Sequence, residues 1–160
     1  MGSKVTLGGV WLGVDPGKVR IGVAASDPDR VLAVPVETVQ RGRADIERIV
    51  AIASERGAVQ IFVGLPRTLS GAERAAAQDA RTFARALAAA TKIPVRLLDE
   101  RLTTVTASRD LRSAGRSVRS SRSVIDQAAA TVLLQSALDT TRESRETVGE
   151  LVLVVDEPTR

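Results

Sequence analysis

The chain of 160 residues has the size of one domain with a buried hydrophobic core, and its formal net charge of +4 gives an isoelectric point near 10.5. It has no cysteine and no histidine, which excludes disulfides, thiolate or imidazole metal sites, and every hydrolytic mechanism that depends on a histidine base. Arginine supplies most of the positive charge. An arginine-rich surface favours phosphate, and hence nucleic acid, as a partner; a solvated charged surface is the alternative.

Three predicted strands open the chain. The apolar runs 10–14 and 19–25 are joined by a Pro-Gly turn, which indicates a hairpin. A third, valine-rich strand at 31–39 contains Pro35. Proline cannot donate a hydrogen bond to a neighbouring strand, so this strand is expected at an edge of the sheet.

Helices and strands alternate in the rest of the chain. The pattern predicts helices at 44–56, 72–90, 103–114 and 124–138, with strands at 59–63 and 94–98. We therefore expect an α/β domain at 1–139, with a mixed five-stranded sheet of three antiparallel and then parallel strands, flanked by helices. The C-terminal tail, 140–160, contains an apolar LVLVV run that fits either an added strand or a partly ordered end.

The sequence shows no signal peptide and no apolar run near the length of a membrane span. We therefore expect a cytoplasmic protein that does not bind membranes.

Acidic residues stand where the strands of the predicted sheet end. Asp15 ends the first strand, and Asp99 and Glu100 end the last one. Functional sites of open α/β sheets gather at the carboxyl ends of the strands, so these acids are candidates for one site. Alternation places Asp99 and Glu100 on opposite faces, so only one of them can point inward at a given spot. As alternatives, Asp15 before Pro-Gly is ordinary turn chemistry, and Glu100 is a solvated charge.

Asp126 lies on the apolar stripe of the last predicted helix, where a carboxylate needs a partner. Its spacing from Ser123 also fits a capping box, in which Asp126 would serve the first turn of that helix. Asp15, Asp126 and one of the two adjacent acids would together be an oxygen-only donor set, which suits Mg²⁺ or Mn²⁺. Such ions support phosphodiester hydrolysis without a histidine base.

Four motifs occur in a fixed order in the chain: GVDPGKVRIGVAASD, VGLPRTLSG, LLDERLTTVTA and IDQAAATVLLQ. In order and spacing they resemble the YqgF/RuvX family, RNase H-like proteins described as candidate Holliday junction resolvases and candidate pre-16S rRNA nucleases. The resemblance spans residues 11–138 and implies an RNase H-like fold. It also implies a catalytic, metal-binding triad of Asp15, Glu100 and Asp126, and it selects Glu100 over Asp99, which alternation does not.

Cations and hydroxyls near the triad are the expected substrate-binding groups: Arg20, Arg67, Arg101, Thr103 and Thr104. The most basic segment, RDLRSAGRSVRSSRS, lies between the last two predicted helices. We expect it to grip a nucleic-acid backbone through Arg112, Arg116 and Arg119. Surface charges, turn residues and a solvated loop are the alternatives for these groups.

The motifs favour a metal-dependent nuclease that processes the 5′ end of pre-16S rRNA in ribosome biogenesis, resolves Holliday junction DNA, or does both. One alternative is a non-catalytic nucleic-acid-binding factor in transcription or ribosome assembly, which a missing acid would have favoured. Another is an ATPase of the actin and sugar-kinase type, whose two lobes need more than 160 residues. A monomer suffices for rRNA processing, whereas symmetric cutting of a junction requires a two-fold homodimer.

Overall fold

The computed structural model describes residues 8–67, 73–102 and 118–154, without the side chains of 102 and 118–124. In these ranges the strands are β1 (Val10–Pro16), β2 (Arg20–Ser26), β3 (Ala33–Gln40), β4 (Ala58–Leu65), β5 (Val95–Asp99) and β6 (Glu150–Leu151). The helices are α1 (Asp45–Arg56), α2 (Ala75–Ala90) and α4 (Val118–Ser144), and a 3-10 turn at Glu100–Leu102 follows β5. No described helix combines the length and the apolar character that crossing a membrane requires.

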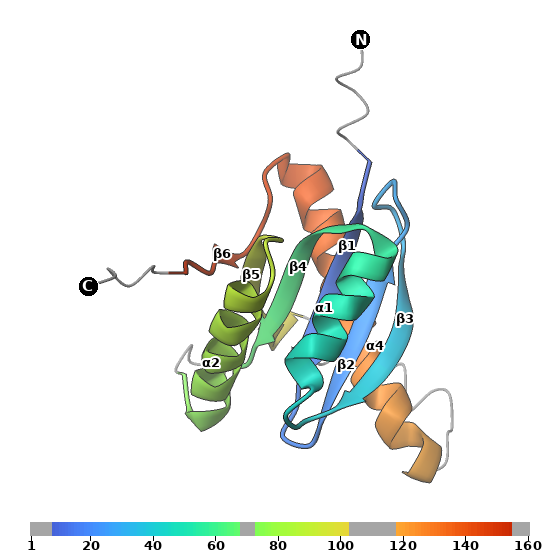
Figure 1. The fold of residues 1–160 in the computed structure, drawn as a ribbon. Helices are drawn as coiled ribbons and strands as arrows, with labels where there is room; N and C mark the ends of the chain where they lie inside the picture. The colour runs from blue at the N-terminus through green and yellow to red at the C-terminus, as the bar shows by residue number, and fades with distance from the viewer. Residues whose placement is uncertain (1–7, 68–72, 103–117, 155–160) are drawn as a thin grey trace, which may run out of the picture.

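The described strands form one mixed sheet in the order β3-β2-β1-β4-β5-β6 (Figure 1). β1, β2 and β3 are an antiparallel meander, and β4 and β5 join it in parallel, as the sequence predicts. β3 lies at the edge, which confirms the prediction from Pro35. The prediction of five strands is one short: β6 pairs antiparallel with β5, Leu151 opposite Arg96. The start of the LVLVV run is therefore an added strand.

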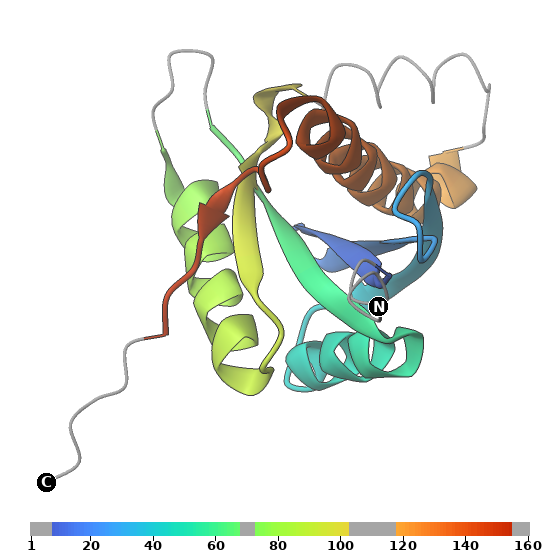
Figure 2. The same ribbon diagram turned by 90° about the horizontal axis from the view of Figure 1, so that it is seen from above.

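Helices cover both faces of the sheet: α1 and α2 lie on one face and α4 on the other (Figure 2). The alternation along β1 divides its side chains between two apolar layers. Leu12 and Val14 belong to the larger cluster on the side of α1 and α2, whereas Trp11 packs with Phe62 and Leu134 beneath α4. Since Asp15 continues the alternation of Trp11, it belongs to the α4 face of the sheet.

Helix α4 is longer than predicted, starting at Val118 rather than at 124 and ending at Ser144 rather than at 138. The stretch at 118–123 is rich in serine and arginine and lacks the apolar spacing by which helices are predicted. Asp126 consequently lies inside the helix, more than two turns from its first residue. The capping-box interpretation with Ser123 is therefore wrong. The helix predicted at 103–114 lies outside the described residues.

Two glycines let α4 lie close to the sheet beside the candidate site. A Cβ atom on Gly13 of β1 would lie 2.8 Å from Cβ of Leu134, and one on Gly22 of β2 would collide with the backbone carbonyl of Asp126. Because these two glycines have no side chain, α4 can lie this close to the sheet, and the contacts fix its height and register over β1 and β2. That register brings Asp126 to the end of the sheet where β1 ends.

Candidate active site

Asp15 and Glu100 meet at the carboxyl ends of β1 and β5, although β4 lies between these strands. Their side chains are hydrogen-bonded to each other, and both are part-buried. Glu100 reaches Asp15 across Gly64 of β4, where a Cβ atom would lie 2.8 Å from Oε1 of Glu100 and 3.0 Å from its Cδ. The absence of a side chain at residue 64 is therefore what lets the two carboxyl groups touch.

The surroundings of this pair favour a retained proton. Burial raises the pKa of Asp15, and the charge of Asp126 raises it further, against the hydrogen bond from Glu100, which lowers it. Burial, the hydrogen bond and charge of Asp15, and the charge of Asp99 raise the pKa of Glu100 to about 9. Two carboxyl groups in contact cannot both ionise easily, so the pair holds one proton between them at neutral pH. A divalent cation can take the place of that proton.

Asp126 comes to the same rim from α4. Its carbonyl group rests on Gly22, which pairs with Asp15 in the β1–β2 ladder, and its charge acts on Asp15. Its carboxylate is, however, held by Arg20, whose Nε donates a hydrogen bond to Oδ2 of Asp126 at 2.8 Å. In the part of the chain that the structure describes, no three acidic side chains are grouped closely enough to hold a metal ion as they stand.

The chemistry of the donors nevertheless fits a hard divalent cation. Asp15 and Glu100 offer oxygen ligands at one point, and their shared proton marks a position where positive charge is favourable. Asp126 would become a third ligand by rotating its side chain away from Arg20, since its backbone is already in place over β2. Asp99 takes no part in this set, because it faces other partners.

Asp99 organises the cations at the end of β5. Arg101 contacts it at 2.6 Å and Arg67 approaches it at 4.0 Å, while Glu73 binds Arg67 at 3.2 Å. These ion pairs hold the pKa of Asp99 below its usual range, chiefly through the hydrogen bonds from Arg101. Every predicted phosphate-binding arginine whose side chain the structure describes is thus engaged by a carboxylate, and a substrate phosphate must compete for it.

The remaining predicted substrate-binding residues cannot be placed. Thr103, Thr104, Arg112 and Arg116 lie outside the described residues, and Arg119 belongs to α4 without a described side chain. Sequence reasoning missed Gly22 and Glu73. A glycine inside a strand is a known signal of close backbone approach and could have indicated Gly22. No comparable signal marks Glu73.

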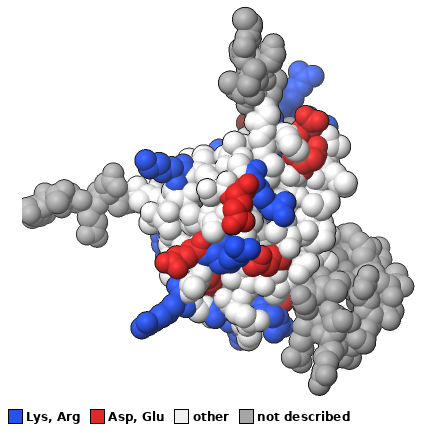
Figure 3. All heavy atoms as spheres, turned by 45° about the vertical axis from the view of Figure 1, so that its right-hand side comes forward, with Lys and Arg blue, Asp and Glu red and all other residues white. Residues whose placement is uncertain are grey.

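Ion pairing also occupies other arginines of the described surface. Arg48 binds Glu37 at 2.6 Å, and Arg41 binds Asp79 at 2.9 Å. On the face shown in Figure 3, the described basic side chains lie among acidic ones and do not gather into one patch. The net positive charge of the chain therefore does not translate into a continuous basic surface on that face.

Comparisons with known proteins agree on a single family. The model of the RuvX family, described as "Holliday junction resolvase", matches residues 9–140. A "Putative pre-16S rRNA nuclease" of Thermobifida fusca is 57% identical over 152 residues, covering 90% of this chain and 96% of the relative. A protein of the same name from Clavibacter michiganensis is 52% identical over 147 residues, covering 90% and 91%.

The comparison of folds points to one architecture. The Thermus thermophilus RuvC structure superposes with a TM-score of 0.52 at 14% identity, covering 88% of this chain and 98% of RuvC. At that identity the likeness concerns the fold alone. It confirms the RNase H-like architecture that the sequence motifs imply.

Proposed function

Because the chain belongs to the RuvX family and brings Asp15 and Glu100 into contact at one rim of its sheet, we propose that it is a divalent-metal-dependent nuclease. The observation that carries the proposal is this part-buried carboxyl pair beneath Asp126. The stability of the fold is a poor explanation for two carboxyl groups that lie in contact and have raised pKa values. Their oxygen atoms are the ligands that a divalent cation such as Mg²⁺ prefers.

In this proposal Asp15, Glu100 and Asp126 are the catalytic carboxylates and the metal ligands. A bound Mg²⁺ or Mn²⁺ would supply an activated water and stabilise the charge that develops on the phosphodiester. The three carboxylates would hold the cation, and Asp15 and Glu100 would have to lose their shared proton to bind it. Arg20, Arg67 and Arg101 stand at the same rim and would orient the phosphate through their N–H groups.

We propose pre-16S rRNA as the first substrate to test, since two relatives that share more than half of their aligned residues with this chain carry that name. The description of the family favours a four-way DNA junction as the second candidate. The names of these relatives and of the family do not favour the alternatives of a non-catalytic factor or an ATPase.

The test is cleavage of labelled precursor 16S rRNA, a four-way DNA junction and a linear duplex, with Mg²⁺ or Mn²⁺, by the wild type and by Asp15→Asn. We expect the wild type to cleave RNA or junction, and Asp15→Asn to lose at least about a hundredfold in rate, as is usual when a group that stabilises the transition state is removed. Chelation with EDTA should abolish the wild-type activity.

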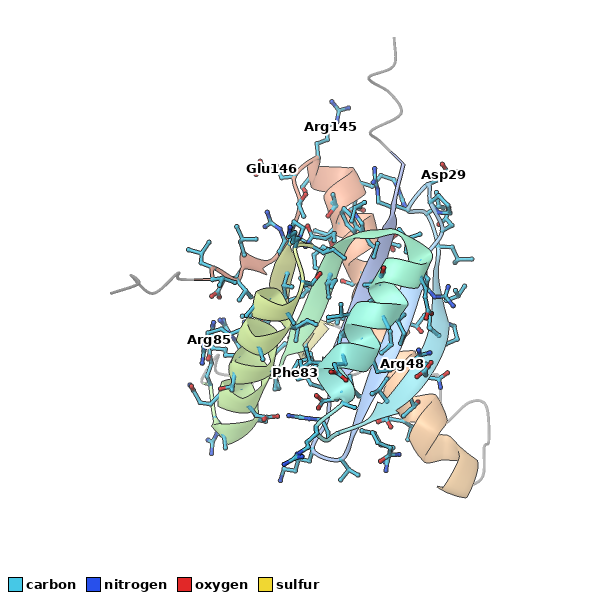
Figure 4. The ribbon with its side chains drawn as sticks, viewed as in Figure 1. Asp29, Arg48, Phe83, Arg85, Arg145 and Glu146 are labelled. Atoms are coloured by element: carbon cyan, nitrogen blue, oxygen red, sulfur yellow. The ribbon has the colours of Figure 1, made fainter. Side chains whose placement is uncertain are left out.

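Asp29→Asn is the matched control, since Asp29 lies at the opposite end of the sheet (Figure 4). It changes the same functional group and should leave cleavage unchanged. Equal activity in the wild type and in Asp15→Asn would identify a contaminating nuclease and refute the proposal.

A further inference from the structure

The ion pair between Arg20 and Asp126 ties up two groups that the proposed reaction uses for different partners. Asp126 is the third acid of the set, and Arg20 is a cation able to bind a phosphate. They meet at 2.8 Å, with 27% and 22% of their side chains exposed. The pair therefore stands at the solvent boundary, where both a cation and a nucleic-acid strand could reach it.

The backbones of both residues are fixed, so only their side chains can rearrange. Arg20 is the first residue of β2 and pairs with Gln40 of β3. Asp126 is held by the close packing of its carbonyl group on Gly22, which is two residues along β2 from Arg20. A change of partner at this point requires side-chain rotation alone and no movement of α4.

The balance of charge explains why Arg20 binds Asp126. The charge of Asp126 acts on Asp15, whose own carboxyl group contacts Glu100. Three acids at one rim repel each other, and the guanidinium of Arg20 offsets the charge of the one that reaches it. A divalent cation among the three carboxylates would do the same more completely, and it would leave Arg20 without its carboxylate.

We propose that Arg20 exchanges partners: it holds Asp126 in the metal-free protein and binds a phosphodiester oxygen of the nucleic acid when a divalent cation takes Asp126. The inference rests on the proposed function for the cation site and for the class of substrate. It has a consequence of opposite sign for the two ligands. Arg20 weakens cation binding when nucleic acid is absent, and it strengthens the binding of nucleic acid when the cation is present.

The test is the affinity of the metal-free protein for Mn²⁺, measured by calorimetry without nucleic acid, in the wild type and in Arg20→Met. We expect Arg20→Met to bind Mn²⁺ about fivefold more tightly, the factor that corresponds to a part-exposed ion pair of about 1 kcal/mol. In steady-state cleavage the same variant should raise KM for the nucleic acid. If Arg20 only stabilised the fold, Arg20→Met would bind both Mn²⁺ and nucleic acid more weakly than the wild type.

Arg101→Met is the matched control, because it removes a cation from the same rim that pairs with Asp99 and not with Asp126. Arg20→Lys keeps the charge and serves as a second test if Arg20→Met does not fold. It should bind Mn²⁺ with an affinity between those of the wild type and Arg20→Met. The inference is overturned if Arg20→Met and Arg20→Lys bind Mn²⁺ no more tightly than the wild type, or if Arg101→Met gains as much as Arg20→Met. If the wild type and Asp15→Asn bind Mn²⁺ equally, the metal site of the proposed function fails, and the inference fails with it.

Discussion

The proton shared by Asp15 and Glu100 should make the metal-free protein less stable as the pH rises. The folded-state pKa of Glu100 is raised from 4.5 to about 9. Its contribution to the free energy of unfolding is therefore full below pH 4.5 and is lost as the pH rises through about 9. Glu100→Gln removes this titration while keeping the size of the side chain, so its stability should depend less on pH.

The size of the effect follows from the number of protons involved. One proton bound in the folded state and absent in the unfolded state lowers the free energy of unfolding by about 1.4 kcal/mol per pH unit. Between pH 5 and pH 8 the ceiling is thus about 4 kcal/mol, and we expect at least about 1 kcal/mol because water reaches part of the site. For a domain of this size, a loss of about 1 kcal/mol lowers the melting temperature by roughly 2–4 °C.

The assay is thermal and urea unfolding in EDTA from pH 5 to pH 8.5. Relative to the wild type, Glu100→Gln should gain stability steadily as the pH rises. Glu37→Gln is the control, because Glu37 binds Arg48, which lowers its pKa, and its titration lies below this pH range. Added Mg²⁺ should flatten the wild-type curve, since the cation replaces the proton. Parallel curves for the wild type and Glu100→Gln in EDTA would refute the shared proton.

Three further predictions concern the packing of α4 on the sheet, the attachment of β6, and the binding of nucleic acid. Gly22→Ala forces a methyl group against the backbone of α4 and should cost about 2–3 kcal/mol in unfolding; a loss below about 0.5 kcal/mol, as at an open surface position, would contradict the close packing. Arg81→Ala removes the ion pair with Glu150 that ties β6 to α2 and should speed hydrogen exchange in β6; unchanged exchange rates would show that the strand pairing suffices. Arg116→Ala with Arg119→Ala should reduce the slope of log affinity against log salt by roughly 1.4–1.8, and an unchanged slope would exclude two phosphate contacts.

The sequence predicted where the acidic residues of the candidate site lie in the sheet better than it predicted which of them contact one another. Turn chemistry and apolar runs placed Asp15 and Glu100 at strand ends, and strand order brought those ends together. Alternation could not say which of Asp99 and Glu100 meets Asp15, because the answer depends on which face of the sheet α4 covers. The resemblance to a family selected Glu100, and the structure supplies the steric reason in Gly64.

Other features escaped prediction because they arise from tertiary contacts. The start of α4 has no apolar spacing, so its first turns carry no helical signal in the sequence. β6 has only two paired residues and exists because the edge of β5 is there to receive it. The ion pair between Arg20 and Asp126 joins residues 106 positions apart, and it depends on the register of α4 over Gly22.

The central claim is that these carboxylates form a metal centre, and anomalous diffraction from crystals soaked in Mn²⁺ tests it most directly. We predict an anomalous peak between the carboxyl groups of Asp15 and Glu100, with Asp126 turned towards it and away from Arg20. A protein that cleaves nucleic acid in Mn²⁺, yet shows no peak at these carboxylates and keeps the pair of Arg20 and Asp126, would contradict the account.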